Sequence, residues 1–298
     1  MSHTEDPSES AGTASGGRAR HRRTALVTGA SSGIGEEYAR QLARRGYDLV
    51  LVARRAERVE ALAGELVEQC GVAAVALPAD LGDPGDLARL EERLRADGTG
   101  EAAPIDLLVN NAGTGGGGHF AEQDTDEIDS MLDLNVRAVL HLARAVIPVQ
   151  ISRRRAAGTG SGAALHMGVI NVSSMAAQLV ANPGGAVYGG TKSFVRLWSE
   201  SVALEVAGSG VHVTAVLPGY VRTEMTRKVQ ESGLPGFAFV PKERIVAESL
   251  RAWAAGRTSV VPGPQYKTAD GLLRLIPRGL FNSVARRGAV QEVQSRLE

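Results

Sequence analysis

Thr28-Gly29-Ala30-Ser31-Ser32-Gly33-Ile34-Gly35 is the stretch of the chain that decides its fold. It follows a short apolar run, Ala25-Leu26-Val27, and precedes a segment with apolar residues at helical spacing. A strand, a glycine turn and a helix in succession bring backbone N–H groups and the positive end of a helix dipole to one point, which suits a phosphate group. Glycine turns before helices also arise from packing alone, so the motif gains meaning only from the rest of the chain.

Composition limits the classes of function. The chain has 298 residues and a formal charge of zero, which gives no reason to expect a nucleic acid or an acidic lipid as partner. Its single cysteine, Cys70, excludes an intramolecular disulfide and favours a reducing compartment, so we expect a cytoplasmic protein. No apolar run approaches the ~20 residues of a membrane span. We expect no metal site.

The pattern of apolar segments predicts one folded domain with two extensions. Residues 1–23 are polar and then basic, and we expect a disordered leader. Residues 24–262 alternate strands and helices, which predicts an α/β fold: a doubly wound parallel sheet of about seven strands with helices on both faces. Residues 263–298 form an amphipathic C-terminal extension. After the first strand, strands are expected at 48–53, 72–77, 105–110, 165–172, 211–217 and 259–261, and helices at 56–69, 86–96, 131–153, 186–207 and 242–255.

Chemistry-bearing residues follow the predicted strands, where such sheets bind ligands. Asn110-Asn-Ala-Gly113, Ser173-Ser174 and Pro218-Gly219 each come directly after a strand. Tyr188 and Lys192 are four residues apart and share one helix face. A tyrosine acting as a base near neutral pH must lower its pKa by about three units, roughly 4 kcal/mol. One ammonium group supplies that order of energy and burial opposes it, so Lys192 alone is marginal, and a second cation, such as an oxidised nicotinamide ring, would complete the shift.

Together these motifs resemble the short-chain dehydrogenase/reductase family, in its single-domain branch with a Rossmann-type fold. The match covers about residues 24–262 in the right order. The resemblance implies that Tyr188 is the catalytic acid/base, that Ser174 orients the carbonyl, and that Lys192 holds the nicotinamide ribose and lowers the tyrosine pKa. It also implies that Asn135 completes a proton relay through water.

Two alternatives stay open within this resemblance. The separation of Ser174 from Tyr188 is 14 residues, one more than the family pattern, which leaves Ser173 as a second candidate for the catalytic serine. An isolated asparagine such as Asn135 is otherwise a polar residue that kinks a helix.

The end of the second strand indicates the cofactor. An aspartate there would accept a hydrogen bond from the adenosine 2′-hydroxyl, but the chain has Ala53 followed by Arg54 and Arg55. A guanidinium group suits a phosphate, so NADP(H) is favoured over NAD(H). The resemblance implies further cofactor contacts from Gly29, Ser31, Ser32, Gly33, Ile34, Gly35, Asp80, Leu81, Asn111, Ala112, Gly113, Pro218, Gly219, Val221 and Thr223, besides Arg54, Tyr188 and Lys192.

The resemblance implies an NADP(H)-dependent oxidoreductase that reduces a ketone or aldehyde to an alcohol, or the reverse. Segment 222–240 stands where the family has its variable substrate lid. Its Met225, Leu234, Phe237 and Phe239 indicate either a hydrophobic substrate or packing in the core.

Two other functions compete with this reading. One is a 3-oxoacyl-thioester reductase, with Arg222, Arg227 and Lys228 near a carrier protein. The other is a non-catalytic NADP(H)-binding regulator, against which the presence of every catalytic residue type argues. We expect a homodimer or homotetramer. The apolar cluster 272–276 could dock on its own domain, on a second subunit or on a membrane surface.

Overall fold

The computed structural model describes residues 22–158, 166–275, 279 and 283. Within them, seven strands form one parallel sheet in the order β3-β2-β1-β4-β5-β6-β7. The order runs outward from β1 in both directions, so the chain reverses between β1 and β4, and the doubly wound fold predicted from the sequence is confirmed. The strands are β1 (Thr24–Thr28), β2 (Asp48–Ala53), β3 (Ala74–Pro78), β4 (Leu107–Asn110), β5 (Met167–Val172), β6 (Val211–Val216) and β7 (Ser259–Val260).

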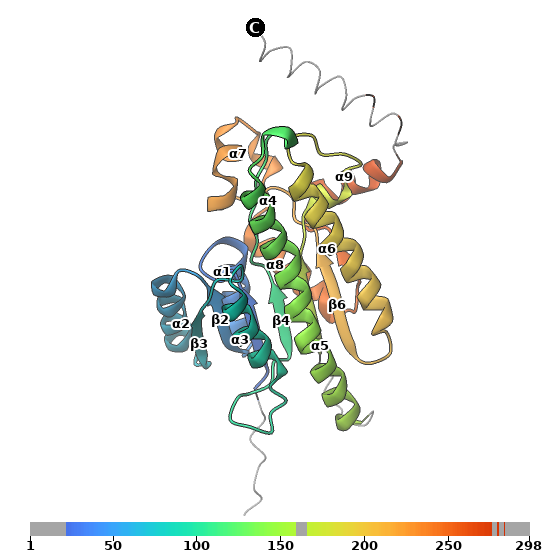
Figure 1. The fold of residues 1–298 in the computed structure, drawn as a ribbon. Coiled ribbons are helices and arrows are strands. Elements are labelled where there is room, and N and C mark those ends of the chain that lie inside the picture. The colour runs from blue at the N-terminus through green and yellow to red at the C-terminus, as the bar shows by residue number, and fades with distance from the viewer. Residues whose placement is uncertain (1–21, 159–165, 276–278, 280–282, 284–298) are drawn as a thin grey trace, which may run out of the picture.

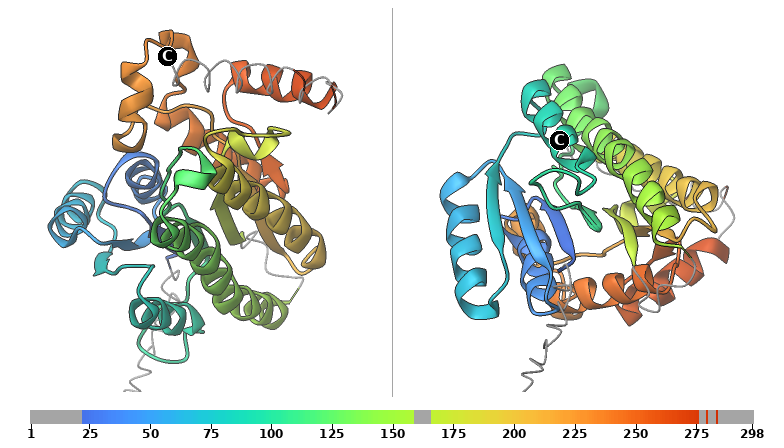
Figure 2. Two further views of the ribbon diagram at one scale, coloured as in Figure 1. Left: turned by 45° about the horizontal axis from the view of Figure 1, so that its top comes forward. Right: turned by 90° about the horizontal axis from the view of Figure 1, so that it is seen from below.

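Helices cover both faces of the sheet (Figure 1). One face packs against α1 (Gly33–Ala43), α2 (Ala56–Cys70) and α8 (Lys242–Ala254), and the other against α3 (Pro84–Arg95), α5 (Ala138–Ala157) and α6 (Ala186–Glu205) (Figure 2). Two more helices, α7 (Arg227–Glu231) and α9 (Pro264–Leu275), lie beyond the carboxyl ends of the strands, at the top of Figure 1. Short 3₁₀ turns occur at Phe120–Glu122, Met175–Gln178, Glu224–Thr226 and Gly236–Ala238.

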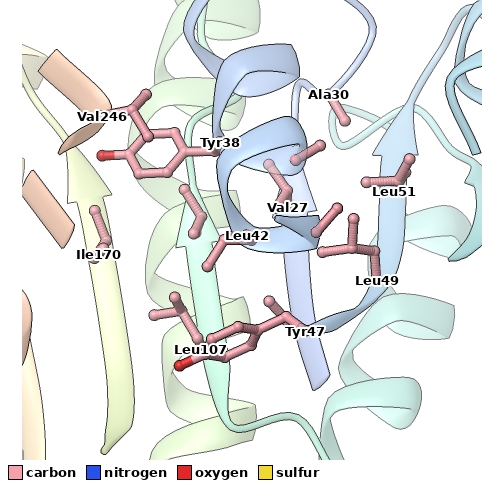
Figure 3. Packing of buried hydrophobic residues seen from close by; sticks show 14 of the residues in the cluster. Val27, Ala30, Tyr38, Leu42, Tyr47, Leu49, Leu51, Leu107, Ile170 and Val246 are labelled. Atoms are coloured by element: carbon pink, nitrogen blue, oxygen red, sulfur yellow. The ribbon is translucent and has the colours of Figure 1, made fainter. Parts of the chain in front are cut away.

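The core beneath α1 explains why the strands are apolar along their whole length. Every residue of β1 is buried, because helices cover both faces of the sheet. Figure 3 shows Tyr38 and Leu42 of α1 packed among Val27, Leu107 and Val246. The Tyr38 hydroxyl lies 2.5 Å from Ser249 Oγ of α8, which satisfies this buried polar group, and burial raises the Tyr38 pKa.

The single long helix predicted at 131–153 is wrong. The structure has α4 (Thr125–Leu132), one π-helical turn at Asp133–Arg137, and then α5. A π turn adds a residue to one helical turn and changes the direction in which its side chains point, which apolar periodicity does not register. The other predicted elements lie within one or two residues of their observed bounds.

The two ends of the described chain differ in how closely they contact the domain. Arg22 donates to the Gly71 carbonyl at 2.6 Å and the Arg23 guanidinium lies 4.5 Å from the centre of the Tyr47 ring, so the last two residues of the predicted leader contact the domain. Residues 1–21 lie outside the described part. At the other end, Leu272 and Leu275 are exposed on α9, so this part of the apolar cluster does not dock on its own domain.

One helical stretch in the described part, Thr125–Ala157, is long and apolar enough to pass a test for a membrane span. The apolar window has a mean hydropathy of 1.2 and is 44% buried inside the protein. This stretch contains α4, the π turn and α5, and α5 packs on the sheet as a core helix.

Candidate active site

The glycine turn forms a backbone cradle at the start of α1. Gly29 and Gly33 have φ values of 65° and 62°, a left-handed conformation that favours glycine. A Cβ at Gly35 would overlap the Gly29 carbonyl, so this glycine lets the helix approach the strand closely. The Ser32 side chain makes no capping bond to α1, which leaves the N–H groups of the first helical turn open to another acceptor. The cradle therefore fits a phosphate group.

Side chains from two strand ends hold this turn in place. Thr28 Oγ1 accepts the N–H groups of Asn111 and Ala112, each at 3.0 Å, and donates to the Val109 carbonyl. The Asn111 amide donates to the carbonyls of Thr28 and Gly29 at 3.0 and 3.3 Å. Asn111 thus acts as a scaffold for the glycine turn. The role of Thr28 is not predicted from the sequence, where it is only the first residue of the glycine stretch.

Tyr188 and Ser174 meet at the carboxyl edge of the sheet. Burial raises the pKa of the Tyr188 hydroxyl, and a hydrogen bond with Ser174 opposes that shift. Ser173 has a different partner, since its buried hydroxyl donates to the Lys192 carbonyl at 2.7 Å. Of the two serines, Ser174 is the one that lowers the Tyr188 pKa, whereas Ser173 is bonded to the Lys192 backbone.

Two buried polar side chains, Lys192 and Asn135, lie at the same site. Lys192 Nζ donates to the Val172 carbonyl at 3.1 Å and lies 5.9 Å from the centre of the Tyr188 ring. The Asn135 side chain forms two 2.9 Å bonds with the backbone of Thr114 and donates to Thr191 Oγ1 at 3.3 Å. Asn135 lies in the π turn, so it both interrupts the helix and faces the site.

Gly113 allows these polar groups to share one space. A Cβ at this position would lie 3.0 Å from Asn135 Oδ1 and 3.3 Å from Lys192 Nζ. The sequence predicts Gly113 as a cofactor contact, and the structure places it between two predicted catalytic residues.

Burial lowers the pKa of Lys192 from 10.5 to about 8. The unfolded chain keeps the ordinary value, so between these two pH values the unfolded state binds more protons and stability rises with pH. Relative to Lys192→Met, the free energy of unfolding of the wild type is expected to rise by up to about 3 kcal/mol between about pH 8 and pH 10.5. Denaturant unfolding of both proteins across this range measures the difference. If the free energies of unfolding of the two proteins changed with pH in parallel, burial would not lower the pKa of Lys192.

The arginines after β2 are held by acidic partners. Arg54 is 74% exposed and its Nη1 lies 3.9 Å from Asp80 Oδ2. Arg55 donates to Ser31 Oγ in the glycine turn and forms a 2.9 Å ion pair with Glu224, which also binds Arg58 at 2.8 Å. Glu224 belongs to the predicted lid, so the lid contacts the rim of the cradle through these arginines.

The remaining predicted residues divide between the cradle and the core. A Cβ at Gly33 would lie 3.1 Å from the Thr223 methyl group, so Thr223 faces the glycine turn. Leu81 and Val221 are buried. In the lid, Phe237 is 76% exposed whereas Phe239 is 8% exposed, so the apolar residues of this segment serve both surface and core.

The chain is similar to known oxidoreductases. A family model described as short chain dehydrogenase matches residues 23–233. Oxidoreductase UcpA of Escherichia coli (strain K12) is 36% identical over 213 residues, which cover 72% of this chain and 74% of that protein. A short-chain dehydrogenase from Sphingobium yanoikuyae, solved in complex with NADPH, is 35% identical with a TM-score of 0.71, over 90% of this chain and 95% of that one. A bulky-bulky ketone specific alcohol dehydrogenase from Comamonas testosteroni is 32% identical with a TM-score of 0.68, over 86% and 95%.

Proposed function

Because the chain belongs to the short-chain dehydrogenase/reductase family, we propose that it is an NADP(H)-dependent enzyme that reduces a ketone or aldehyde to an alcohol, or catalyses the reverse reaction. The observation that carries the proposal is the Tyr188 hydroxyl, which is hydrogen-bonded to Ser174, on a ring whose centre lies 5.9 Å from the buried Lys192 Nζ. Members of this family are NAD(P)-dependent oxidoreductases. The choice of NADP(H), the substrate class and the roles of individual residues are our inferences.

The chain's own groups would handle the proton. When bound, the nicotinamide cofactor supplies a hydride to the carbonyl carbon or accepts one from the alcohol. The raised pKa of Tyr188 keeps its hydroxyl protonated at neutral pH, so Tyr188 would donate a proton to the carbonyl oxygen during reduction. Ser174 would hold the same oxygen by a second hydrogen bond. Asn135 would hold a water molecule through which a proton returns to Tyr188. Lys192 would supply a positive charge beside this path.

The cradle fits the pyrophosphate of a dinucleotide. We propose that Arg54 binds the 2′-phosphate on the adenosine ribose of NADP(H). The guanidinium group is mostly exposed, and its distance of 3.9 Å from Asp80 makes this pair a weak one that a phosphate can replace. Arg55 is already bonded to Ser31 and Glu224, so it is less available.

Arg54→Asp is expected to shift the ratio of NADPH to NADH affinity toward NADH by about tenfold, because the variant carboxylate repels the phosphate and accepts a bond from the ribose. Fluorescence titration of both cofactors measures the ratio. Arg95→Asp, at the end of α3, carries the same change of charge away from the cradle and should leave the ratio unchanged. An equal ratio in wild type and Arg54→Asp would remove Arg54 from phosphate recognition.

For the substrate we propose a bulky, hydrophobic carbonyl compound. Met225, Phe237 and Tyr220 are exposed on the segment beside the site, and a relative is described as specific for bulky-bulky ketones. The alternative substrate is a 3-oxoacyl thioester. NADPH oxidation against a panel of ketones, aldehydes and acyl thioesters, with chromatographic identification of the alcohol, decides between the two. Oxidation with thioesters alone would favour the alternative, and binding of NADPH without turnover on any compound would favour a regulator.

We also propose a cytoplasmic homo-oligomer. Three large apolar side chains, Phe194, Leu197 and Leu204, are exposed along α6. Apolar side chains at this spacing form one stripe on a helix, and such stripes commonly lie between subunits. Sedimentation velocity of the purified protein measures its oligomeric state directly.

A further inference from the structure

The segment between β6 and α8, which contains the predicted lid 222–240, closes on itself at a narrow neck. Tyr220 and Phe239 pair as an isolated parallel bridge, and the Val240 N–H donates to the Tyr220 carbonyl at 2.8 Å. The Tyr220 and Phe239 rings lie 6.3 Å apart between centroids. A surface loop whose ends meet in this way moves about its ends, so the neck decides where the rest of the lid can lie.

A side chain of the C-terminal helix α9 is bonded to both arms of this neck. The Tyr266 hydroxyl accepts the Tyr220 N–H at 3.1 Å and donates to the Ala238 carbonyl at 2.9 Å. The preceding residue, Gln265, adds a bond of 3.2 Å from Nε2 to the Phe237 carbonyl. The Tyr266 hydroxyl thus links the backbone just before the lid, at Tyr220, to the backbone near its end, at Ala238.

The Tyr266 ring is seated on the turn that follows β6. A Cβ at Gly219 would overlap this ring, although the backbone conformation at Gly219 is not left-handed. Glycine is therefore required at 219 by the close approach of Tyr266 and not by the turn itself. The Pro218-Gly219 pair is predicted as a cofactor contact, so the ring of Tyr266 packs directly behind a part of the proposed site.

Helix α9 is itself fixed to the sheet layers. Lys267 Nζ forms a 2.7 Å ion pair with Glu248 of α8, and α8 is buried against the sheet through residues such as Ile245 and Leu250. Tyr266 therefore holds the lid against a rigid part of the domain and not against another loop.

The lid segment lies next to the proposed reacting groups. A Cβ built at Gly115 would lie 3.8 Å from the Met225 side chain and 4.0 Å from Tyr188 Cε2, so both side chains border one space. The Tyr220 hydroxyl is also close enough to Tyr188 to act on it electrostatically. A shift of the neck would consequently move the residues that face a substrate at Tyr188.

We propose that Tyr266 is a positioning residue whose hydroxyl clamps both arms of the lid and thereby sets the affinity for the carbonyl substrate. It takes no part in proton transfer, because its hydroxyl is bonded to two backbone groups of the neck, the Tyr220 N–H and the Ala238 carbonyl. The substrate readout rests on the proposed function, whereas the clamp itself can be measured without turnover.

Tyr266→Phe keeps the ring on Gly219 and removes only the two hydroxyl bonds. Trypsin cleaves after arginine, and Arg222 and Arg227 are exposed within the lid, so limited proteolysis with peptide mapping reports opening of the lid. Cleavage at these two residues is expected to be roughly tenfold faster in the variant, since each lost hydrogen bond favours local opening. The KM for the carbonyl substrate should rise by a similar factor, while kcat and the affinity for NADPH stay within about twofold.

Tyr38→Phe is the matched control, because Tyr38 also loses a hydroxyl bond but lies in the core between α1 and α8. It should lower the melting temperature without faster cleavage in the lid. Unchanged cleavage at Arg222 and Arg227 in Tyr266→Phe, or an equal increase in Tyr38→Phe, would overturn the proposal. Gln265→Ala removes the neighbouring bond to Phe237 and should show a smaller increase, so it decides the question if Tyr266→Phe does not fold. Faster cleavage in a protein that shows no turnover would support the clamp and reject only the proposed function.

Discussion

Tyr188→Phe is expected to lower kcat for carbonyl reduction by about 10²- to 10⁴-fold, the usual contribution of a positioned general acid. The variant keeps the aromatic ring, so the packing around the partly buried side chain is preserved and the affinity for NADPH should remain within about threefold. The lost group is the hydroxyl that shares a hydrogen bond with Ser174. Steady-state kinetics and fluorescence titration of NADPH together measure the two effects.

Tyr47→Phe provides the matched control for this substitution. As with Tyr188, burial raises the pKa of Tyr47, but its ring lies under Arg23 at the opposite end of the fold. It should retain full turnover. Wild-type activity in Tyr188→Phe would reject the assignment of the proton donor, and equal losses in both variants would indicate a general effect on folding.

Gly35→Ala is expected to weaken NADPH binding by about ten- to a hundredfold, because overpacking against backbone commonly costs 1–3 kcal/mol. The added Cβ would overlap the Gly29 carbonyl and the Asn111 amide, and neither group can move without opening the cradle. The melting temperature should fall as well, since the same overlap separates α1 from β1. Isothermal titration with NADPH and thermal unfolding measure the two losses.

Gly64→Ala makes the same chemical change at a position where we expect it to stabilise the protein instead of destabilising it. Gly64 lies inside α2, its backbone is helical, and no described atom beyond its chain neighbours and its own helix backbone lies within 4 Å of the added Cβ. Alanine there should stabilise the protein by up to about 1 kcal/mol and leave NADPH binding unchanged. Equal NADPH affinities in Gly35→Ala and the wild type would mean that the glycine turn does not hold the cofactor.

The pKa values of Tyr188 and Lys192 indicate what the protein alone does to its proposed catalytic groups. Burial raises the first and lowers the second, so each is shifted toward its neutral form. The sequence argument that Lys192 alone is a marginal source of the shift agrees with this direction. In the protein without cofactor, burial raises the pKa of Tyr188, so the lowering implied by the family resemblance stays a prediction for the complex with the cofactor.

The fold and the outline of the site follow from local patterns in the sequence. The glycine turn, the apolar strands and the pair of Tyr188 and Lys192 each depend on spacing within a few residues, which a sequence displays directly. Parallel topology then gathers the strand ends at one edge.

Other features depend on contacts between distant residues and are not visible in the sequence. The different partners of Ser173 and Ser174 are one example, since only the Ser173 hydroxyl donates to the Lys192 carbonyl. The π turn around Asn135 keeps the apolar spacing of a helix while it adds a residue, so periodicity cannot detect it. The bond from Tyr266 to Tyr220 crosses 46 residues, and no local pattern at either residue indicates it.

The central claim is that Tyr188 protonates a carbonyl oxygen while NADPH reduces the carbonyl carbon. It is tested most directly by incubating the purified wild-type protein with a bulky hydrophobic ketone and NADPH that carries deuterium at the transferable position of the nicotinamide. Mass spectrometry of the alcohol is expected to find one deuterium on the carbinol carbon, and Tyr188→Phe should form almost none of this product. An alcohol without deuterium, or no alcohol from any ketone, aldehyde or thioester although NADPH binds, would contradict the account.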